Sequence, residues 1–549
     1  MVNKIFSWLM SHKEVVVLLG CTVLFLLLIF KDPFSERTLI PNFEPHPDTF
    51  NYINPALSFV RGEGFRMGRE ERALLLNVPP LYSFTLVPAF ILNPDPRTAY
   101  YANVFLAIFS LLLFWLILKR VIKNQWIIYL LLTLYITNFF LYWVPSLIMA
   151  ENLTLTLFLI AFFFLTNKTT MLNTVIIAFV AIGLYATKYA NIPTTSAVII
   201  LFLFKLFSEK LILKQKLKSA FIFISALIFF LLMLGIFEGY TKGNNIFSQI
   251  FEHLVSIYSS VPKIESADSQ ASPKATWFGV QYISQNLPLY LKSLAGSPNR
   301  FLWDQTPLIP QFVGLFGLIG IMMGLFYKRG RFISLALLLF ICSSIMFMSI
   351  FYSFDTRYVY IIIPILLIGF GLLLKKIEEK VRKKAFFVFA VVIILIIYLA
   401  TNFIRIKSQI SLNLKYAETP WHYIAVLKMN EYFTNDKVVN GKKPILISAE
   451  PPFLIDYYSN GNYTLLPLSY EQEFRGIKEI VWGPNDYSDL PKLYTQYLKE
   501  GYNVYVSRSG LGNEGYTNRD FNIIINEFET KLVLSGCYDQ CNIYSVRLK

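Results

Sequence analysis

Residues 332–351 read FISLALLLFICSSIMFMSIF, a run of twenty residues without a charged side chain. An α-helix needs about 20 mainly apolar residues to cross the hydrocarbon core of a bilayer, where its backbone polar groups are satisfied within the helix. Comparable apolar runs lie at residues 15–30, 220–237 and 385–400. We therefore expect several membrane-spanning helices.

The overall composition agrees with a membrane protein. Of the 549 residues, 55% are hydrophobic and only 15% are charged, whereas soluble domains carry about 25% charged residues. Hydropathy predicts about eleven membrane helices. They fall near residues 15–30, 98–118, 125–143, 152–166, 172–188, 192–207, 219–237, 308–326, 332–351, 358–374 and 385–403.

The distribution of lysine and arginine predicts the orientation, because basic loops stay on the cytoplasmic side. With the N-terminus inside, the inner segments hold 20 Lys and Arg and 4 Asp and Glu. Their net charge is therefore +16, whereas that of the whole chain is +15. Topology thus accounts for the basic excess, and a nucleic-acid partner is not expected. The inner segments are 1–14, 119–124, 167–170, 205–218, 327–331 and 375–384.

The remaining long segments then lie outside the cytoplasm. We expect a transmembrane domain at residues 1–404, with outer loops 31–97 and 238–307, in a plasma-membrane protein whose C-terminus is outside. The short apolar stretch 81–92 is interpreted as an interfacial helix, because counting it as a crossing would reverse every later loop. Residues 405–549 are expected to form an extracytoplasmic α/β domain. Its predicted strands are 444–448, 503–507, 531–534 and 542–546, and its predicted helix is 490–500.

The first outer loop carries a candidate catalytic carboxylate, Asp48. Tyr52, Ala56 and Phe59 follow it at the i, i+4, i+7 spacing of one helical face. Inverting sugar transfer needs a base that takes the acceptor's proton, and a carboxylate within hydrogen-bond reach is the usual choice. Asp is also a common cap of a following helix. Residue type alone favours the cap.

The wider motif favours catalysis. Asp48 is followed by Tyr52, Ala56, Gly62 and the element Pro79-Pro80-Leu81-Tyr82. This pattern resembles the first periplasmic or lumenal loop of the GT-C superfamily, in particular the relatives of protein O-mannosyltransferases and aminoarabinose transferases (glycosyltransferase family 39-like). Weaker likenesses to the same family occur at Met149-Ala150-Glu151, at Gly183 to Lys188, and at Asp355-Thr-Arg357-Tyr358.

The resemblance implies a helical membrane fold with an outward-facing cavity. It also implies an enzyme that moves a hexosyl or pentosyl group from a polyprenyl-phosphate carrier to a lipid, glycan or protein acceptor. Asp48 would then be the general base, supported by Tyr52, Tyr82, Glu151 and Tyr358. Two alternatives remain open from the residues: a transporter or flippase for a lipid-linked saccharide, and a non-catalytic binder of such a lipid.

Two cations at the predicted outer helix ends, Lys188 and Arg357, are candidates for binding the donor phosphate. The positive-inside rule disfavours them there, whereas Arg and Lys suit a phosphate and stabilise it as a leaving group. The alternatives are that Lys188 extends toward the membrane interface and that Arg357 pairs with Asp355. Glu151 is equally explained as a favourable charge at a helix N-terminus.

A metal requirement is left open by the sequence. Many GT-C members have a second acidic residue beside the catalytic one, whereas Thr49 follows Asp48 here. His46, Glu252 and His253 are weak candidate ligands, because their spacing is not that of a metal site and surface roles explain them as well. Cys537 and Cys541 are placed to close a small disulfide loop if this region lies in an oxidising compartment.

Overall fold

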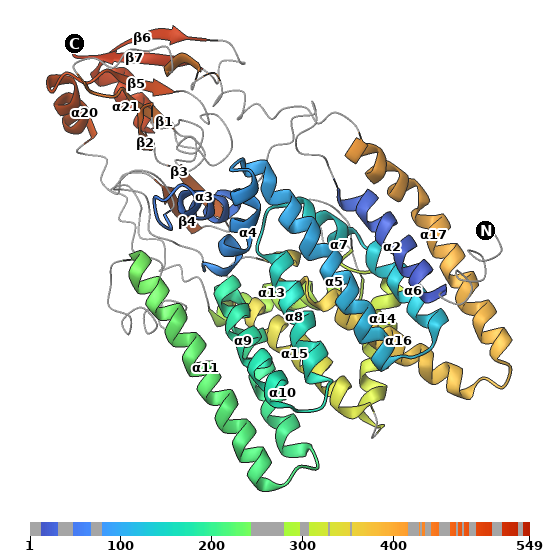
Figure 1. Cartoon of the computed structure of the whole chain (residues 1–549). Helices are drawn as coiled ribbons and strands as arrows, with labels where there is room; N and C mark the ends of the chain where they lie inside the picture. The colour runs from blue at the N-terminus through green and yellow to red at the C-terminus, as the bar shows by residue number, and fades with distance from the viewer. Residues whose placement is uncertain are drawn as a thin grey trace, which may run out of the picture. The chain divides into compact units, whose positions relative to one another are not determined.

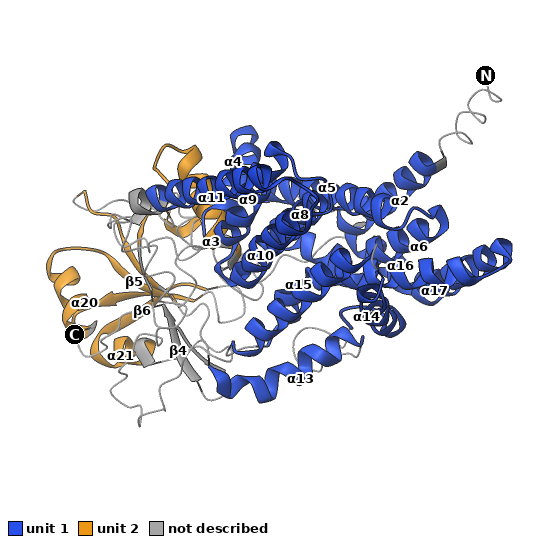
Figure 2. Cartoon of the chain, turned by 90° about the horizontal axis from the view of Figure 1, so that it is seen from below, with its two compact units in different colours: residues 1–37, 78–254, 278–416 blue, residues 38–77, 255–277, 417–549 orange. Residues whose placement is uncertain are grey.

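A computed structural model of the chain contains two compact units, which Figure 2 distinguishes by colour. Unit 1 comprises residues 1–37, 78–254 and 278–416, and unit 2 comprises residues 38–77, 255–277 and 417–549. Each unit is described by itself. The structure describes residues 13–30, 48–66, 79–242, 279–296, 307–327, 330–351, 354–414, 428, 431–433, 441–448, 462–467, 470–474, 477–482, 490–507, 519–535 and 542–549.

Unit 1 is built from long helices (Figure 1). Its α-helices are α2 (Lys13–Ile29), α4 (Leu81–Leu92), α5 (Ala99–Val121), α6 (Gln125–Ile136), α7 (Phe139–Trp143), α8 (Glu151–Leu165), α9 (Met171–Thr187), α10 (Ile192–Ser208), α11 (Leu213–Lys242), α13 (Ile283–Leu294), α14 (Gln311–Leu325), α15 (Arg331–Ser349), α16 (Ile362–Lys380) and α17 (Lys384–Leu414). Short 3₁₀ turns join some of them: η1 (Pro96–Thr98), η2 (Val144–Ser146), η3 (Tyr189–Asn191), η4 (Val280–Tyr282) and η5 (Thr356–Val359).

The structure has helix at each of the eleven positions predicted from hydropathy. By length and apolar composition, five of the described helices can cross a bilayer, or six if one bent pair forms a single span. Several others are apolar but shorter, among them α2, α8, α9 and α14. The count of eleven crossings therefore stays a prediction. Helix α4 is short, as expected for residues 81–92, and its place at the membrane interface also stays a prediction.

The helix predicted at residues 125–143 is broken, so its description as one continuous helix is wrong. Helices α6 and α7 meet at a bend of 60°. The cause is Asn138, whose side-chain oxygen accepts hydrogen bonds from the backbone N–H groups of Phe140 (3.0 Å) and Leu141 (3.3 Å) and so caps a new helix. The amide of Asn138 also donates to the carbonyl of Leu308 at 2.9 Å, which fixes the bend inside the bundle.

Glycines allow α14 and α16 to pack closely. A Cβ atom added at Gly320 would collide with the carbonyl oxygen of Gly369, and one added at Gly369 would collide with that of Gly317. Small residues at such contacts are typical of helix pairs in membranes, where close backbone approach rather than the hydrophobic effect stabilises the pair. These glycines therefore set the distance between the two helices.

Unit 2 contains a five-stranded mixed sheet and a separate two-stranded hairpin. The strand order of the sheet is β2-β1-β5-β7-β6; β1 pairs in parallel with β2 and β5, and β7 pairs antiparallel with β5 and β6. Its elements are α3 (Asp48–Val60), β1 (Ile445–Ser448), β2 (Thr464–Pro467), β3 (Tyr470–Phe474), β4 (Ile477–Trp482), α20 (Leu490–Lys499), β5 (Val504–Ser507), α21 (Arg519–Glu527), β6 (Glu529–Leu534) and β7 (Ile543–Arg547).

Apolar residues of the sheet and its two helices form the core of unit 2. Ile447 and Val506 are buried on the central strands, where Tyr494 of α20 and Ile524 of α21 join them. Strands occur at all four predicted positions. The hairpin β3-β4 was missed because a strand reading Tyr-Glu-Gln-Glu-Phe lacks the apolar run or clear alternation from which strands are predicted.

Replacing Gly320 by leucine is expected to destabilise unit 1 by about 1–3 kcal/mol or more, because the side chain collides with the α16 backbone. Gly20→Leu is the matched control, since a Cβ at Gly20 has nothing within 4 Å. The measurement is the midpoint of thermal unfolding of the detergent-purified chain. Equal midpoints for both variants would contradict the close packing of α14 and α16.

Candidate functional site

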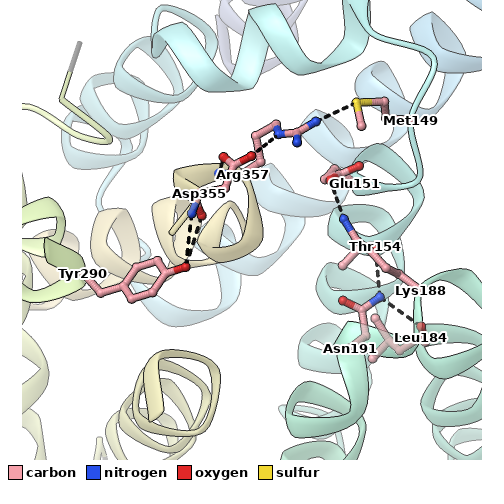
Figure 3. A network of polar contacts seen from close by, with 9 residues as sticks. All are labelled: Met149, Glu151, Thr154, Leu184, Lys188, Asn191, Tyr290, Asp355 and Arg357. Atoms are coloured by element: carbon pink, nitrogen blue, oxygen red, sulfur yellow. Dashed lines mark hydrogen bonds and ion pairs between the residues drawn. The ribbon is translucent and has the colours of Figure 1, made fainter. Parts of the chain in front are cut away.

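The start of α8 and the end of α9 are joined by a buried ion pair. Glu151 is the first residue of α8 and only 4% exposed. Its Oε1 atom accepts a hydrogen bond from Nζ of Lys188, the residue that follows α9, at 2.7 Å (Figure 3). A carboxylate is favourable at a helix N-terminus, and an adjacent ammonium stabilises its charged form. The two residues therefore form one charge-compensated unit.

A second ion pair lies in the 3₁₀ turn η5. Asp355 caps this turn: its Oδ1 accepts from the backbone N–H of Arg357 at 2.8 Å and its Oδ2 from Nε of Arg357 at 2.6 Å. The guanidinium also reaches the thioether of Met149, with Nη1 3.2 Å from Sδ. Met149 lies two residues before Glu151, so this contact brings the second pair close to the start of α8 (Figure 3). The pairing that the sequence left as an alternative for Arg357 is present.

Neutral polar groups next to Lys188 join η3 to α8 and α9. The amide of Asn191 donates to the hydroxyl of Thr154 at 2.9 Å and to the carbonyl of Leu184 at 3.0 Å. The ammonium of Lys188 lies 4.8 Å from the centre of the Tyr358 ring, within the range of a cation–π interaction. Figure 3 shows Lys188 beside Glu151 at the start of α8, and Asn191 of η3 beside Thr154 of the same helix.

Several of these groups line a small cavity of about 20 Å³. Two buried polar atoms at this pocket have no hydrogen-bond partner in the described part of the chain: Oε2 of Glu151 and Oγ of Ser344. A buried polar atom without a partner costs free energy, and a ligand, an ion or water in the pocket would satisfy it. The lining residues are Glu151, Thr154, Lys188, Ala190, Asn191, Pro193, Thr194, Ser344, Met348, Arg357, Tyr358, Tyr360 and Ile361.

The pocket lies at one end of the helices, away from the basic loops. Helix α8 runs from Glu151 to Leu165 and α9 returns to Thr187, so Glu151 and Lys188 share one end. At the other end, Nζ of Lys205 donates to the carbonyl of Asn167. The segments 167–170 and 205–218 therefore lie at the end opposite the pocket.

The two supporting tyrosines of the first-loop motif are both buried. The hydroxyl of Tyr82 in α4 donates to Oδ1 of Asn103 at 2.7 Å, and Asn103 in turn donates to the carbonyl of Leu147 at 2.8 Å. Tyr82 thus ties α4 to the chain before α8 and does not line the pocket. Tyr52 lies in α3 with Ala56, while Phe59, expected on the same face, is 46% exposed.

The candidate base Asp48 is the first residue of α3. Its side chain lies outside the described part of the structure, as do the weak metal candidates His46, Glu252 and His253 and the two C-terminal cysteines, Cys537 and Cys541. Within the residues that are described, no group of three or more His, Cys, Asp or Glu side chains is placed to hold a metal ion.

The sequence indicated the charged members of the pocket and Tyr358, but not its other neutral members. Lys188 and Arg357 were expected on a shared phosphate site, and both line the pocket with Glu151 and Tyr358. The pairing of Glu151 with Lys188 was missed, because 37 residues separate the two in sequence. Ser344 could have been proposed from the sequence, because it is a polar residue inside the apolar run of α15.

Neither a protein-family model nor a curated protein matches the sequence. Among solved structures, ArnT from Cupriavidus metallidurans bound to undecaprenyl phosphate aligns with a TM-score of 0.56 and 11% identity over 97% of each chain. The same protein in the apo state aligns with a TM-score of 0.55 and 10% identity over 100% of this chain and 98% of that one. The apo oligosaccharyltransferase of Archaeoglobus fulgidus aligns with a TM-score of 0.54 and 11% identity over 91% of this chain and 70% of that one.

At such low identities the likeness shows the fold alone. The chain has the fold of these proteins, which confirms the GT-C-like fold expected from the first-loop motif. Together with the long apolar helices of unit 1, it identifies the chain as an integral membrane protein.

Lys188→Met is expected to destabilise unit 1 by about 3 kcal/mol, because it leaves the carboxylate of Glu151 buried without its partner. Adding Glu151→Gln is expected to restore most of that loss. The readout is thermal unfolding in detergent, without any ligand. Lys119→Met is the matched control, since Lys119 and Glu14 form a 2.7 Å pair that is 43% and 30% exposed and worth at most about 1 kcal/mol. A double variant no more stable than Lys188→Met would contradict the coupling.

Proposed function

We propose that this chain is a glycosyltransferase that moves a sugar from a polyprenyl-phosphate carrier to an acceptor on the extracytoplasmic face of the membrane. The observation that carries the proposal is the buried polar pocket of Lys188, Arg357 and Glu151 within this particular fold. One structure with the same fold holds undecaprenyl phosphate, which supports the class of donor. The group transferred would be a hexosyl or pentosyl residue.

The chemistry of the pocket suits a lipid phosphate. A polyprenyl-phosphate donor carries its anionic group at the edge of the membrane, with the isoprenoid tail among apolar helices. Lys188 and Arg357 line the same pocket, and their side chains are 22% and 9% exposed, so their attraction for an anion is less screened than it would be in water. Arginine in particular presents several N–H donors to phosphate oxygens.

The proposed reaction is an inverting displacement at the anomeric carbon. The bond between that carbon and the phosphate oxygen breaks, and its electron pair stays on the phosphate, where Lys188 and Arg357 stabilise the added charge. The acceptor hydroxyl or amine forms the new bond from the opposite face of the sugar. Asp48 takes the proton that the acceptor loses. The acceptor is a lipid, a glycan or a protein.

The proposed orientation places the N-terminus inside and the C-terminus outside. Two features support it: the pocket lies at the end of α8 and α9 opposite the basic segments, and unit 2 gathers residues 38–77, 255–277 and 417–549. These three ranges belong to the three long segments that the charge distribution assigns to the outer face. In this proposal residues 1–404 embed the chain in the membrane, and residues 405–549 form an extracytoplasmic α/β domain.

Asp48→Asn is expected to reduce sugar transfer by at least about a thousandfold, because the amide cannot accept the acceptor's proton. Asp48→Glu is expected to keep part of the activity. The measurement is transfer of radiolabelled sugar from membrane donor lipids by the purified full chain, beside an assay of donor transport across vesicles. The control is Glu63→Gln, which removes the charge of an exposed carboxylate in the same loop. Transfer by Asp48→Asn at the rate of the control would remove Asp48 as the base, and transport without transfer would favour the transporter.

The orientation predicts which surfaces an impermeant reagent reaches. In a chain whose four cysteines are replaced by serine, Lys499→Cys is expected to react with a membrane-impermeant maleimide in intact cells, whereas Lys214→Cys reacts only after the membrane is permeabilised. Both positions are exposed at the surface of their units, so local burial does not decide the result. The reverse labelling pattern would overturn the orientation.

A further inference from the structure

Both cations of the pocket are already paired with carboxylates. Lys188 is bound to Glu151 at 2.7 Å and Arg357 to Asp355 at 2.6 Å. Among the described lining residues and their ion-pair partners, the positive and negative charges therefore cancel. A phosphate that binds to Lys188 has to displace a carboxylate or share the ammonium with one.

We propose that Glu151 is an exchangeable counter-ion for Lys188. It holds the ammonium while the pocket is empty, yields it to the donor phosphate, and then weakens the retention of the product phosphate. This inference rests on the proposed function, since it assumes that the ligand is a polyprenyl phosphate. Glu151 acts here through Lys188, as a positioning residue, and has no covalent role.

The geometry singles out Glu151 rather than Asp355 as the carboxylate that moves. Asp355 uses both of its oxygens within η5, one of them on the backbone N–H of Arg357, so its departure would also uncap the turn. Glu151 holds Lys188 through Oε1 alone, and its Oε2 has no partner in the described part of the chain. Releasing Lys188 therefore breaks a single side-chain contact.

The energetics favour exchange once an anion arrives. A buried carboxylate with one unsatisfied oxygen has paid much of its desolvation cost without full compensation. A phosphate offers several oxygens to the same ammonium and forms strong charge-assisted hydrogen bonds with it. Ser344, whose buried Oγ also has no partner among the described residues, lines the pocket and adds a hydroxyl that a ligand could satisfy.

Glu151 also distinguishes the donor from the product by charge. The donor phosphate is a diester with one negative charge, whereas the released polyprenyl phosphate is a monoester with a charge of about −1.5 to −2 near pH 7. Because like charges repel, a carboxylate that stays close to the site after it has yielded Lys188 disfavours the product more than the donor. Its removal is expected to slow product release rather than to weaken binding.

The test measures binding of two probes to the detergent-purified full chain by calorimetry: farnesyl phosphate, a monoester, and farnesyl methyl phosphate, a diester. Glu151→Gln is expected to bind the monoester about tenfold tighter, equal to about 1.4 kcal/mol, and the diester less than about threefold tighter. Glu151→Asp, which keeps the charge, is expected to stay near the wild type for both probes. The control is Glu14→Gln, which removes the carboxylate of the Glu14–Lys119 pair outside the pocket. It is expected to change neither affinity.

The outcomes separate this inference from the proposed function. If the wild type binds neither probe, or if Lys188→Met leaves monoester binding unchanged, the lipid-phosphate function fails. If Lys188→Met weakens binding but Glu151→Gln fails to tighten the monoester selectively, only the counter-ion role fails. Thermal unfolding of Glu151→Gln, with and without the monoester, checks that the variant is folded. If the monoester raises the unfolding midpoint of the variant no more than that of the wild type, the counter-ion role also fails.

Discussion

The need to compensate charge inside an apolar bundle is the constraint on which the structure around the pocket depends. A lysine ammonium at the end of α9 is tolerated because Glu151 begins the neighbouring helix 2.7 Å away. Arg357 is tolerated because Asp355 holds it within one turn. Removing one partner from such a pair costs far more than removing both. The pairs therefore fix how α8, α9 and η5 meet, and they leave a polar pocket where packing alone would have favoured apolar side chains.

The fold was largely predictable because its signals are long and local. Hydropathy placed helices at the positions where α5, α11 and α17 are found, since a bilayer demands about 20 apolar residues in succession. The break between α6 and α7 was not predictable in this way. It depends on Asn138, which caps α7 and bonds to the distant carbonyl of Leu308. A hydropathy average over a long apolar segment is hardly changed by one asparagine, so it does not reveal the break.

The site was predictable only in part, for a related reason. Lys188 and Arg357 stood out because each is a cation on the face where the predicted topology disfavours basic residues. Glu151 gave no sign of its partner, because a contact across 37 residues becomes visible only when α8 and α9 pack side by side. The motif around Asp48 has a different status: its support comes from a resemblance in sequence. Physical proximity to the pocket is not part of that support.

The central claim is that Lys188 and Arg357 receive the phosphate of a polyprenyl carrier, and a structure of the chain with undecaprenyl phosphate tests it most directly. Cryo-electron microscopy of the full chain in lipid nanodiscs containing this lipid would locate the phosphate. The account predicts phosphate density within hydrogen-bond distance of Lys188 and Arg357, with the Glu151 carboxylate turned away from the ammonium. A phosphate bound elsewhere on the chain, with both ion pairs of the pocket intact, would contradict it.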